Sequence, residues 1–320
     1  MITIYSSPLQ GFTDFRFRNA FQMYFGGIDQ YIAPYIRLNG KTEIKPVNER
    51  DLLPANNSTL NLIPQIITKE AGEFLFVAKY VQKLGYSELN WNLGCPYPMI
   101  AKRGMGSGLL SNPGKIDEIL NRVSAETDIQ VSVKMRLGYE SPREIFNVLP
   151  VLEKYRLANI TIHPRIGKQL YKGEVDLKAF EECLGQSSHK IFYNGDITSV
   201  RSFREMKDRF PAINNWMIGR GLIADPLLPA MIKADNDVYP ENRYELFNSF
   251  HDALFSSYEE ALSGQKHLLM KMYPFWEYFI QSFPHSSKGL KKIKKAQNIS
   301  VYREIVKQII NNEAANSAQD

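Results

Sequence analysis

Two patterns of apolar residues alternate along the first 235 or so residues of the chain. Short runs rich in β-branched and aromatic residues indicate buried strands. Longer stretches, in which apolar residues recur every three or four positions, indicate helices with one buried face. The predicted strands span residues 2–6, 28–33, 62–67, 88–92, 130–135, 159–163, 190–193 and 216–218, and the predicted helices span 14–24, 70–84, 115–126, 142–154, 177–184, 200–209 and 226–233.

This alternation predicts βαβ units and a parallel sheet. Eight strands with intervening helices in a segment of this length match a (β/α)8 TIM barrel. An open, doubly wound sheet is the alternative, and it would need a Gly-rich turn after its first strand. The turn here reads Ser7-Pro-Leu-Gln-Gly-Phe-Thr-Asp and has one glycine, which favours the barrel. Residues 34–61 are polar and Asn-rich and show no clear helix.

The pattern changes after residue 240. Residues 241–312 have helical periodicity, with helices predicted over 243–262, 266–279 and 301–312. We therefore expect two domains, a barrel over 1–240 and a small all-α helical bundle over 241–320, with a frayed polar tail at 316–320. No apolar run approaches the roughly 18 residues of a membrane span, and the N-terminal segment resembles a strand rather than a signal peptide.

Polar residues follow six of the eight predicted strands. In a barrel these positions meet at the carboxyl-end face, where active sites are built. The sequence therefore predicts a site there, formed by Gln65, Cys95, Lys134, Arg136, His163, Arg165, Asn194, Gly195, Asp196, Gly219 and Arg220.

Cys95 lies in Asn92-Leu-Gly-Cys-Pro, where a glycine and a proline end a strand and fix the thiol in a rigid turn. A small buried hydrophobe is the other interpretation of such a cysteine. Cys95 and Cys183 are the only cysteines; they lack metal-ligand spacing and are too few for a disulfide framework. We therefore expect no metal, and a reducing, cytoplasmic location.

Two glycine-marked loops, Asn194-Gly195-Asp196 and Gly219-Arg220-Gly221, follow the last two strands, where barrels bind phosphate. Glycines let backbone N–H groups approach an anion, although a tight turn would also explain them. Lys134 is expected to point inward from a central strand, so it needs an anionic ring, a phosphate or an internal carboxylate as partner. His163 is either a ligand-binding or a structural histidine.

These segments, in this order, resemble the tRNA-dihydrouridine synthases, flavin enzymes that reduce specific uridines in tRNA. The opening turn is similar to the family's Ala-Pro-Met-x-Gly-x-Thr-Asp, and the Cys95 segment with Lys102-Arg-Gly-Met-Gly-Ser-Gly resembles its cysteine loop. Later motifs that match are Val133-Lys-Met-Arg-Leu-Gly, His163-Pro-Arg, Asn194-Gly-Asp-Ile and Met217-Ile-Gly-Arg-Gly. This sequence differs from the family's pattern at three positions. Leu9 stands where the family has methionine, and Thr68 and Pro164 stand where it usually has glycine.

The resemblance implies FMN as cofactor, with NADPH or NADH as electron donor. It places Pro8, Leu9 and Gln10 under the isoalloxazine ring, Gln65 at its polar edge, Lys134 beside it and His163 in support. Asn194, Gly195, Asp196, Gly219 and Arg220 would hold the ribityl chain and phosphate.

The family chemistry also implies a role for Cys95, because hydride addition to C6 of uracil requires a proton at C5. A thiol with a pKa of about 8.5 can act as this general acid. A covalent nucleophile is the alternative, but it would need a thiolate. The uracil must leave the RNA stack; Asn92 and Arg136 are candidates to read its edge, and Arg165 and Lys102 to meet phosphates.

The helical domain is then expected to bind the body of the tRNA. The segment Lys288-Gly-Leu-Lys-Lys-Ile-Lys-Lys has five lysines in eight residues, although residues 241–320 have only 10 Lys and Arg against 9 Asp and Glu. Such a cluster is an electrostatic footprint for nucleic acid, or an ordinary solvated helix face. The candidates for RNA contact are Lys291, Lys292 and Lys295, with Arg37 on the barrel side.

Two other functions remain open from the sequence. A flavin barrel acting on a free pyrimidine or a small enone would share the loops and the thiol, but it has no need of residues 241–312. An RNA-binding barrel without chemistry predicts loss of the inner polar residues, yet Cys95, Lys134, His163 and Arg220 are all present.

Overall fold

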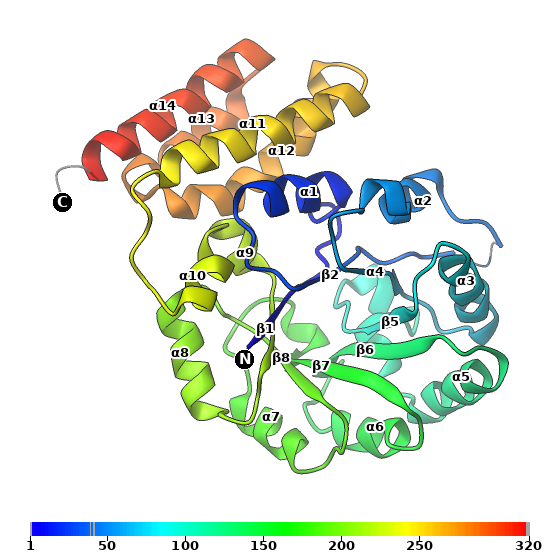
Figure 1. The fold of residues 1–320 in the computed structure, drawn as a ribbon. Coiled ribbons are helices and arrows are strands. Elements are labelled where there is room, and N and C mark those ends of the chain that lie inside the picture. Colours follow the sequence, from blue (N-terminus) through cyan, green and yellow to red (C-terminus); the bar gives the residue numbers. More distant parts are fainter. Residues whose placement is uncertain (1, 39, 41, 318–320) are drawn as a thin grey trace. The chain divides into compact units, whose positions relative to one another are not determined.

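The computed structural model describes residues 2–38, 40 and 42–317 (Figure 1). They form two compact units, which are described one at a time below. The first comprises Met1–Phe15, Asp29–Gly195 and Phe210–Ile218, and the second comprises Arg16–Ile28, Asp196–Arg209 and Gly219–Asp320. The division into a barrel over 1–240 and a helical domain over 241–320 stays a prediction.

The first unit is a parallel α/β barrel, as predicted. All strand pairs of the described sheet are parallel, in the order β3-β2-β1-β9-β8-β7-β6-β5-β4. The strands are β1 (Thr3–Ser6), β2 (Gln30–Ile32), β3 (Leu62–Ile63), β4 (Gln65–Ile66), β5 (Glu88–Leu93), β6 (Gln130–Gly138), β7 (Leu157–Ile166), β8 (Ile191–Asn194) and β9 (Asn215–Ile218). Each strand predicted from the sequence is present.

The described sheet has nine strand segments where the sequence predicts eight, because Pro64 divides the third predicted strand in two. It separates β3 from β4, and it has no N–H to donate to the ladder. The segment before it pairs with β2, where Ala33 N donates to Ile63 O at 3.0 Å. The segment after it pairs with β5, and Asn90 N donates to Pro64 O itself at 2.9 Å. One interrupted strand therefore joins both ends of the sheet and closes the barrel.

Helices follow the strands of this unit, and Figure 1 shows α3, α5, α6 and α7 on the outside of the sheet. Their amphipathic sequences bury one face each, which is the pattern that predicted them. The helical elements are α2 (Pro46–Leu52), η1 (Pro54–Asn56), α3 (Ala71–Lys83), α4 (Pro98–Ala101), η2 (Gly106–Leu109), α5 (Pro113–Glu126), α6 (Ile145–Leu152), η3 (Gly167–Gln169) and α7 (Leu177–Leu184).

Two helices differ from their predictions for local reasons. Helix α2 lies in the segment where no helix was evident, because only Asp51 and Leu52 of its seven residues are buried and no periodicity shows. Helix α6 begins three residues later than predicted, since the Glu144 carboxylate accepts the N–H groups of residues 139–141 and holds them in a turn.

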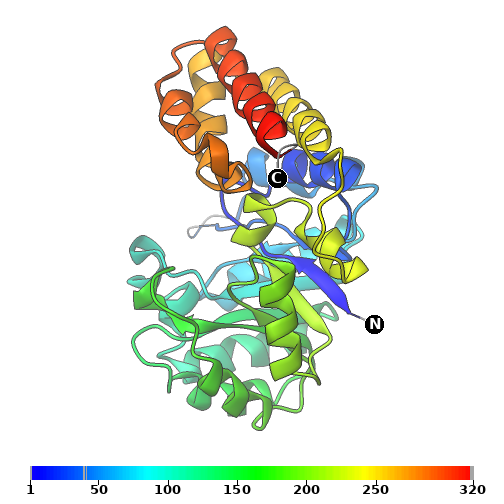
Figure 2. The same cartoon turned by 90° about the vertical axis from the view of Figure 1, so that its left-hand side faces the viewer.

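The second unit is helical. It contains α1 (Phe15–Tyr24), α8 (Val200–Arg209), α9 (Arg220–Ala224), α10 (Leu228–Ala234), α11 (Arg243–Ala261), α12 (Gln265–Phe279), η4 (Ile280–Ser282), η5 (Pro284–Ser286), α13 (Gly289–Lys295) and α14 (Ile299–Ser317). Of α1, the first residue belongs to the first unit and the rest, from Arg16, to the second. The C-terminal helices pack side by side (Figure 2). This agrees with the expected all-α segment.

Aromatic rings form the centre of these C-terminal helices. The ring of Phe247 lies 5.2 Å from that of Phe279 and 4.8 Å from that of Phe283, with Trp276 6.1 Å away. The predicted frayed tail is wrong in part: Asn316 is helical, and its Nδ2 donates to Asn312 O at 2.6 Å. Residues 318–320 lie outside the described chain. Within the part that is described, no helix is long and apolar enough to cross a membrane.

Candidate active site

A chain of buried, hydrogen-bonded polar side chains links β4, β5 and β6 in the first unit. Parallel pairing aligns Gln65 with Asn90, and Asn90 with Ser132, so their side chains share one face. Asn90 Nδ2 donates to Ser132 Oγ at 2.8 Å, Gln65 Nε2 to Asn90 Oδ1 at 2.7 Å, and Asn92 Nδ2 to Gln65 Oε1 at 2.9 Å. The chain fixes the side chain of Asn92.

Asn92 in turn fixes the turn that carries the thiol. Its Oδ1 accepts the backbone N–H of Gly94 at 3.0 Å and of Cys95 at 2.8 Å. From the other side, Ser107 Oγ donates to Cys95 O at 3.0 Å. Gly106 has a φ of +57°, and a Cβ there would lie 2.7 Å from Cys95 O, so this close approach requires glycine. The predicted rigid turn is present.

The Cys95 side chain is 8% exposed. It packs with Ile67, Ile100 and Met105, and the ring of Tyr35 lies against this cluster. Burial disfavours the thiolate and raises the pKa of Cys95 above its usual value. The Tyr97 backbone N–H, the Tyr35 hydroxyl and the arginines 136 and 37 oppose that rise without cancelling it. The thiol is therefore protonated at neutral pH.

Lys134 lies on β6 without a carboxylate partner among the described residues. Its Nζ donates to Asn194 Oδ1 at 2.7 Å, and Asn194 Nδ2 donates to Met217 O at 2.8 Å. Burial, and then the charge of Arg136, lower the pKa of Lys134 to about 7, against a smaller opposing effect of Cys95. The internal carboxylate that the sequence left open is therefore not its partner. A bound anion would restore its charge.

Arg136 is buried and held at its head group. Its Nη1 donates to Ile166 O at 2.7 Å, and its guanidinium lies 5.3 Å from the centre of the Tyr171 ring. This arrangement leaves a cation next to Lys134 on the same strand. The expected contact of Arg136 with a uracil edge stays a prediction.

His163 and Arg165 interact on β7. Arg165 Nη1 lies 3.1 Å from His163 Nε2, and its Nη2 donates to Gly173 O at 2.6 Å. Because a guanidinium only donates, His163 Nε2 is the acceptor and the ring proton lies on Nδ1. Arg165 is 2% exposed, so its expected contact with an RNA phosphate stays a prediction.

Most of the remaining candidate residues of the first unit have side chains that are more exposed to solvent than those of Arg136, His163 and Arg165. Pro8 and Leu9 are half-buried and Gln10 is exposed, in a turn where Leu9 N donates to Thr13 Oγ1 at 2.9 Å. Arg37 is half-buried, and Lys102 is exposed after α4. Gly195 follows β8, where a Cβ would lie 3.0 Å from Val175.

In the second unit, the loop that begins at Asp196 meets the turn at Gly219 and Arg220. Arg220 Nη2 lies 3.0 Å from Asp196 Oδ1, in a half-exposed ion pair. A Cβ on Gly221 would lie 2.2 Å from Ile197 O, so only glycine permits this approach. The structure brings these predicted phosphate residues together, and it pairs the arginine with a carboxylate that the sequence did not predict as its partner.

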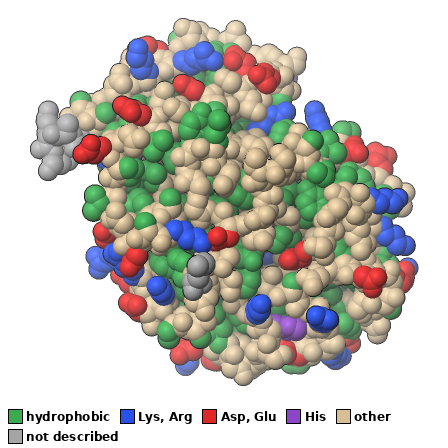
Figure 3. Space-filling view, in the orientation of Figure 1, with side chains coloured by type: hydrophobic (Ala, Val, Ile, Leu, Met, Phe, Trp, Pro, Cys, Tyr) green, Lys and Arg blue, Asp and Glu red, His purple; other side chains and the backbone are tan. Residues whose placement is uncertain are grey.

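The lysines of α13 and the residue before it form an exposed cationic cluster, defined as Lys288, Lys291, Lys292, Lys294 and Lys295. Lys294 Nζ pairs with Glu277 at 2.7 Å. For the lysines 291, 292 and 295, no ion pair is present within the described chain. On the face drawn in Figure 3, by contrast, Lys and Arg side chains lie interspersed with Asp and Glu.

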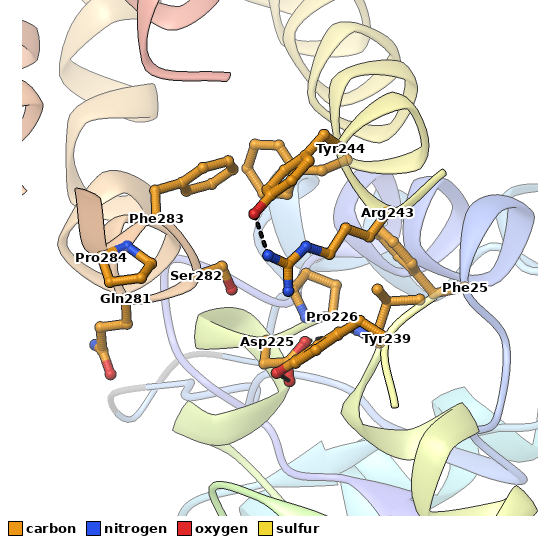
Figure 4. Close-up of a pocket in the computed structure, with 12 residues that line it drawn as sticks. Phe25, Asp225, Pro226, Tyr239, Arg243, Tyr244, Gln281, Ser282, Phe283 and Pro284 are labelled. Atoms are coloured by element: carbon orange, nitrogen blue, oxygen red, sulfur yellow. Dashed lines mark hydrogen bonds between the residues drawn. The ribbon is translucent and has the colours of Figure 1, made fainter. Parts of the chain in front are cut away.

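A separate cavity of about 200 Å³ lies in the second unit, and none of the predicted residues lines it. Figure 4 shows Arg243 between two tyrosines. Its guanidinium lies 4.8 Å from the Tyr239 ring and 4.4 Å from the Tyr244 ring, and it donates to the Tyr244 hydroxyl. Tyr239 Oη donates to Asp225 Oδ2 at 2.7 Å. These contacts connect the polar groups of the cavity to one another.

Sequence reasoning missed Tyr35, Asn90 and Ser107. Asn90 has a signal, since it precedes Asn92 by two residues and so shares its face of the strand. Ser107 has one as well, since it lies in the glycine segment that follows the Cys95 turn. Tyr35 has none, because it lies 60 residues before the thiol that it contacts. No group of three or more His, Cys, Asp or Glu side chains in the described residues is arranged to hold a metal ion.

Comparison with known proteins finds curated relatives over most of the chain. A probable tRNA-dihydrouridine synthase of Rhodobacter capsulatus is 27% identical over 277 residues, covering 82% of this chain and 83% of that protein. The tRNA-dihydrouridine synthase B of Pasteurella multocida is 25% identical over 250 residues, covering 77% of this chain and 74% of that protein.

Solved structures also share the fold, and two of them serve as examples. A variant of NCR from Zymomonas mobilis matches with a TM-score of 0.52 at 13% identity, covering 74% of this chain and 88% of that one. A morphinone reductase mutant in complex with tetrahydroNAD matches with a TM-score of 0.52 at 9% identity, covering 78% of this chain and 90% of that one. The family model described as Dihydrouridine synthase (Dus) matches residues 5–318, and the chain therefore belongs to the dihydrouridine synthase family.

Proposed function

We propose that this protein, an oxidoreductase of the dihydrouridine synthase family, reduces uridines in tRNA to 5,6-dihydrouridine. FMN is the bound cofactor and NADPH or NADH the electron donor. The observation that carries the proposal is a protonated, buried thiol on the same barrel end as a lysine that has no anionic partner among the described residues. The names of the relatives point to the same substrate.

The residues present fit an anionic, hydrogen-bonding cofactor. Lys134 donates to a neutral amide, and its lowered pKa of about 7 reflects burial that a negative charge would offset. When bound, FMN supplies the hydride that adds to C6 of uracil. Lys134 would lie beside its ring, with Pro8, Leu9 and Gln10 below. Gln65, His163, Asn194 and Gly195 would bind it further, and the assignment of Asp196, Gly219 and Arg220 to its phosphate stays a prediction from the sequence.

Cys95 serves as the general acid. The carbon atom C5 needs a proton when C6 gains hydride, and the donor must carry that proton at neutral pH. Burial keeps Cys95 in the thiol form, which suits an acid better than a nucleophile. Asn92 holds the backbone of the turn and forms no bond with the sulfur itself.

The RNA requires two kinds of contact. A uracil reaches a barrel site only after leaving its stack, so Asn92 and Arg136 are proposed to read its edge, and Lys102 and Arg165 to meet its phosphates. Arg37 is proposed as a further RNA contact on the barrel side. The body of the tRNA is proposed to bind Lys291, Lys292 and Lys295, because exposed cations without carboxylate partners attract phosphates.

The test is reduction of tRNA by the purified protein. We expect a yellow preparation with one FMN per chain that, with NADPH or NADH, forms dihydrouridine in tRNA from a strain lacking the gene. Mass-spectrometric mapping identifies the modified positions. Free uridine is the matched control: product from it at a similar rate would favour a small-molecule reductase. A colourless protein that takes up no flavin, or flavin without product, would reject the proposal.

A further inference from the structure

Tyr35 has a fixed position beside the reactive thiol. It lies just after β2, and its neighbour Ile36 forms backbone hydrogen bonds with Gln65 of β4 and with Ile67, the residue after β4. Ile36 N donates to Gln65 O at 2.7 Å, and Ile67 N donates to Ile36 O at 3.0 Å. These bonds hold the backbone beside Tyr35 and do not involve the Cys95 turn.

The tyrosine hydroxyl contacts the sulfur. In the structure the Cys95 thiol donates to Tyr35 Oη, with Sγ and Oη 4.0 Å apart, and the ring packs on the cluster of Ile67, Cys95 and Met105. In the described residues, no other side-chain hydroxyl, amide or charged group forms a hydrogen bond with this sulfur. Burial and the neighbouring sulfur raise the pKa of Tyr35, so its proton stays in place at neutral pH.

We propose that Tyr35 is a positioning residue that donates its hydroxyl proton in a hydrogen bond to the Cys95 sulfur as the thiol protonates C5 of uracil. The inference rests on the proposed function. In this step the S–H bond breaks, a C5–H bond forms, and the electron pair of the broken bond remains on sulfur. A thiolate has no proton to donate, so the hydroxyl must be the donor once the transfer has occurred.

The energetic reason is the burial of the sulfur. Desolvation makes a bare thiolate costly, and therefore makes the buried thiol a weak acid. The groups that offset this cost are the Tyr97 backbone N–H, the Tyr35 hydroxyl, and the charges of Arg136 and Arg37; Lys134 is coupled to the same sulfur. A hydrogen bond from the Tyr35 hydroxyl to the thiolate therefore lowers the pKa of Cys95 against the effect of burial.

The experiment measures the pKa of Cys95 directly. Cys183→Ala leaves Cys95 as the only thiol of the chain. In this background, the rate of alkylation by iodoacetamide is followed against pH in the purified holoprotein. Tyr35→Phe keeps the ring and removes the oxygen, so we expect the alkylation midpoint to rise by about one to two pH units. Tyr97→Phe is the matched control, because its contact with the sulfur is through the backbone, and its midpoint should not move.

A second variant and a second readout complete the test. Tyr35→Met fills the same apolar place without a donor and should shift the midpoint in the same direction. The rate of tRNA reduction should fall about three- to tenfold in both variants, as a weaker acid donates more slowly. An unmoved midpoint in both variants, or a shifted midpoint with an unchanged rate, would overturn the role of Tyr35. Failure of the unmodified protein to reduce tRNA would reject the proposed function instead, while the alkylation midpoints would still decide whether the hydrogen bond exists.

Discussion

Removal of the Cys95 thiol should separate proton donation from every earlier step. In Cys95→Ala, the bonds that hold the turn remain, because Asn92 and Ser107 contact backbone atoms and not the sulfur. The variant should therefore fold, keep its flavin and accept electrons from the nicotinamide coenzyme. Transfer to uridine should fall by at least ~100-fold, the usual contribution of a positioned general acid.

Cys183→Ala is the matched control, since it removes the other buried thiol. Cys183 lies on α7 with no exposed surface, and burial raises its pKa to about 12. Each alanine variant loses a packed sulfur, which costs about 1 kcal/mol of folding stability for a group of that size. Both variants should therefore lower the melting temperature by similar small amounts, and Cys183→Ala should keep full activity.

The assay follows the two half-reactions in turn. Flavin reduction by NADPH or NADH is recorded from flavin absorbance without tRNA, and tRNA is then added anaerobically while reoxidation and dihydrouridine formation are measured. Only the second phase should slow in Cys95→Ala. Equal and modest losses in both variants, or a normal second phase in Cys95→Ala, would refute the assignment of Cys95 as the acid.

Three further predictions concern charge. Lys134 has a pKa of about 7, and an anion beside it raises that pKa. FMN binding at about pH 8 should therefore take up a proton, and the affinity for FMN should fall as the pH rises. Calorimetry in two buffers of different ionisation enthalpy measures this proton uptake, which should be absent in Lys134→Met. Arg220→Ala should weaken FMN binding by about 2 kcal/mol in a fluorescence titration if this arginine contacts the phosphate. Replacing Lys291, Lys292 and Lys295 with glutamine should leave the melting temperature unchanged, but lower tRNA affinity and flatten its dependence on salt; an unchanged salt slope would make the cluster an ordinary solvated helix face.

The sequence determined the fold class and much of the candidate site. Strand and helix periodicities are local properties, so all eight barrel strands were predictable, and with them the residues at their carboxyl ends. The rigid turn around Cys95 was also predictable, because glycine and proline restrict the backbone wherever they occur. The C-terminal helices followed from the change of period after residue 240.

Only the tertiary structure decided which groups meet. Asn194 rather than a carboxylate is the partner of Lys134, Asp196 pairs with Arg220, and the Tyr35 hydroxyl lies beside the Cys95 sulfur. Closure of the barrel through the strand that Pro64 interrupts also depends on pairing between distant segments. The period of a sequence fixes the face on which a side chain lies, but partners and pKa values depend on strand register and burial, which arise only when segments far apart in the chain pack together.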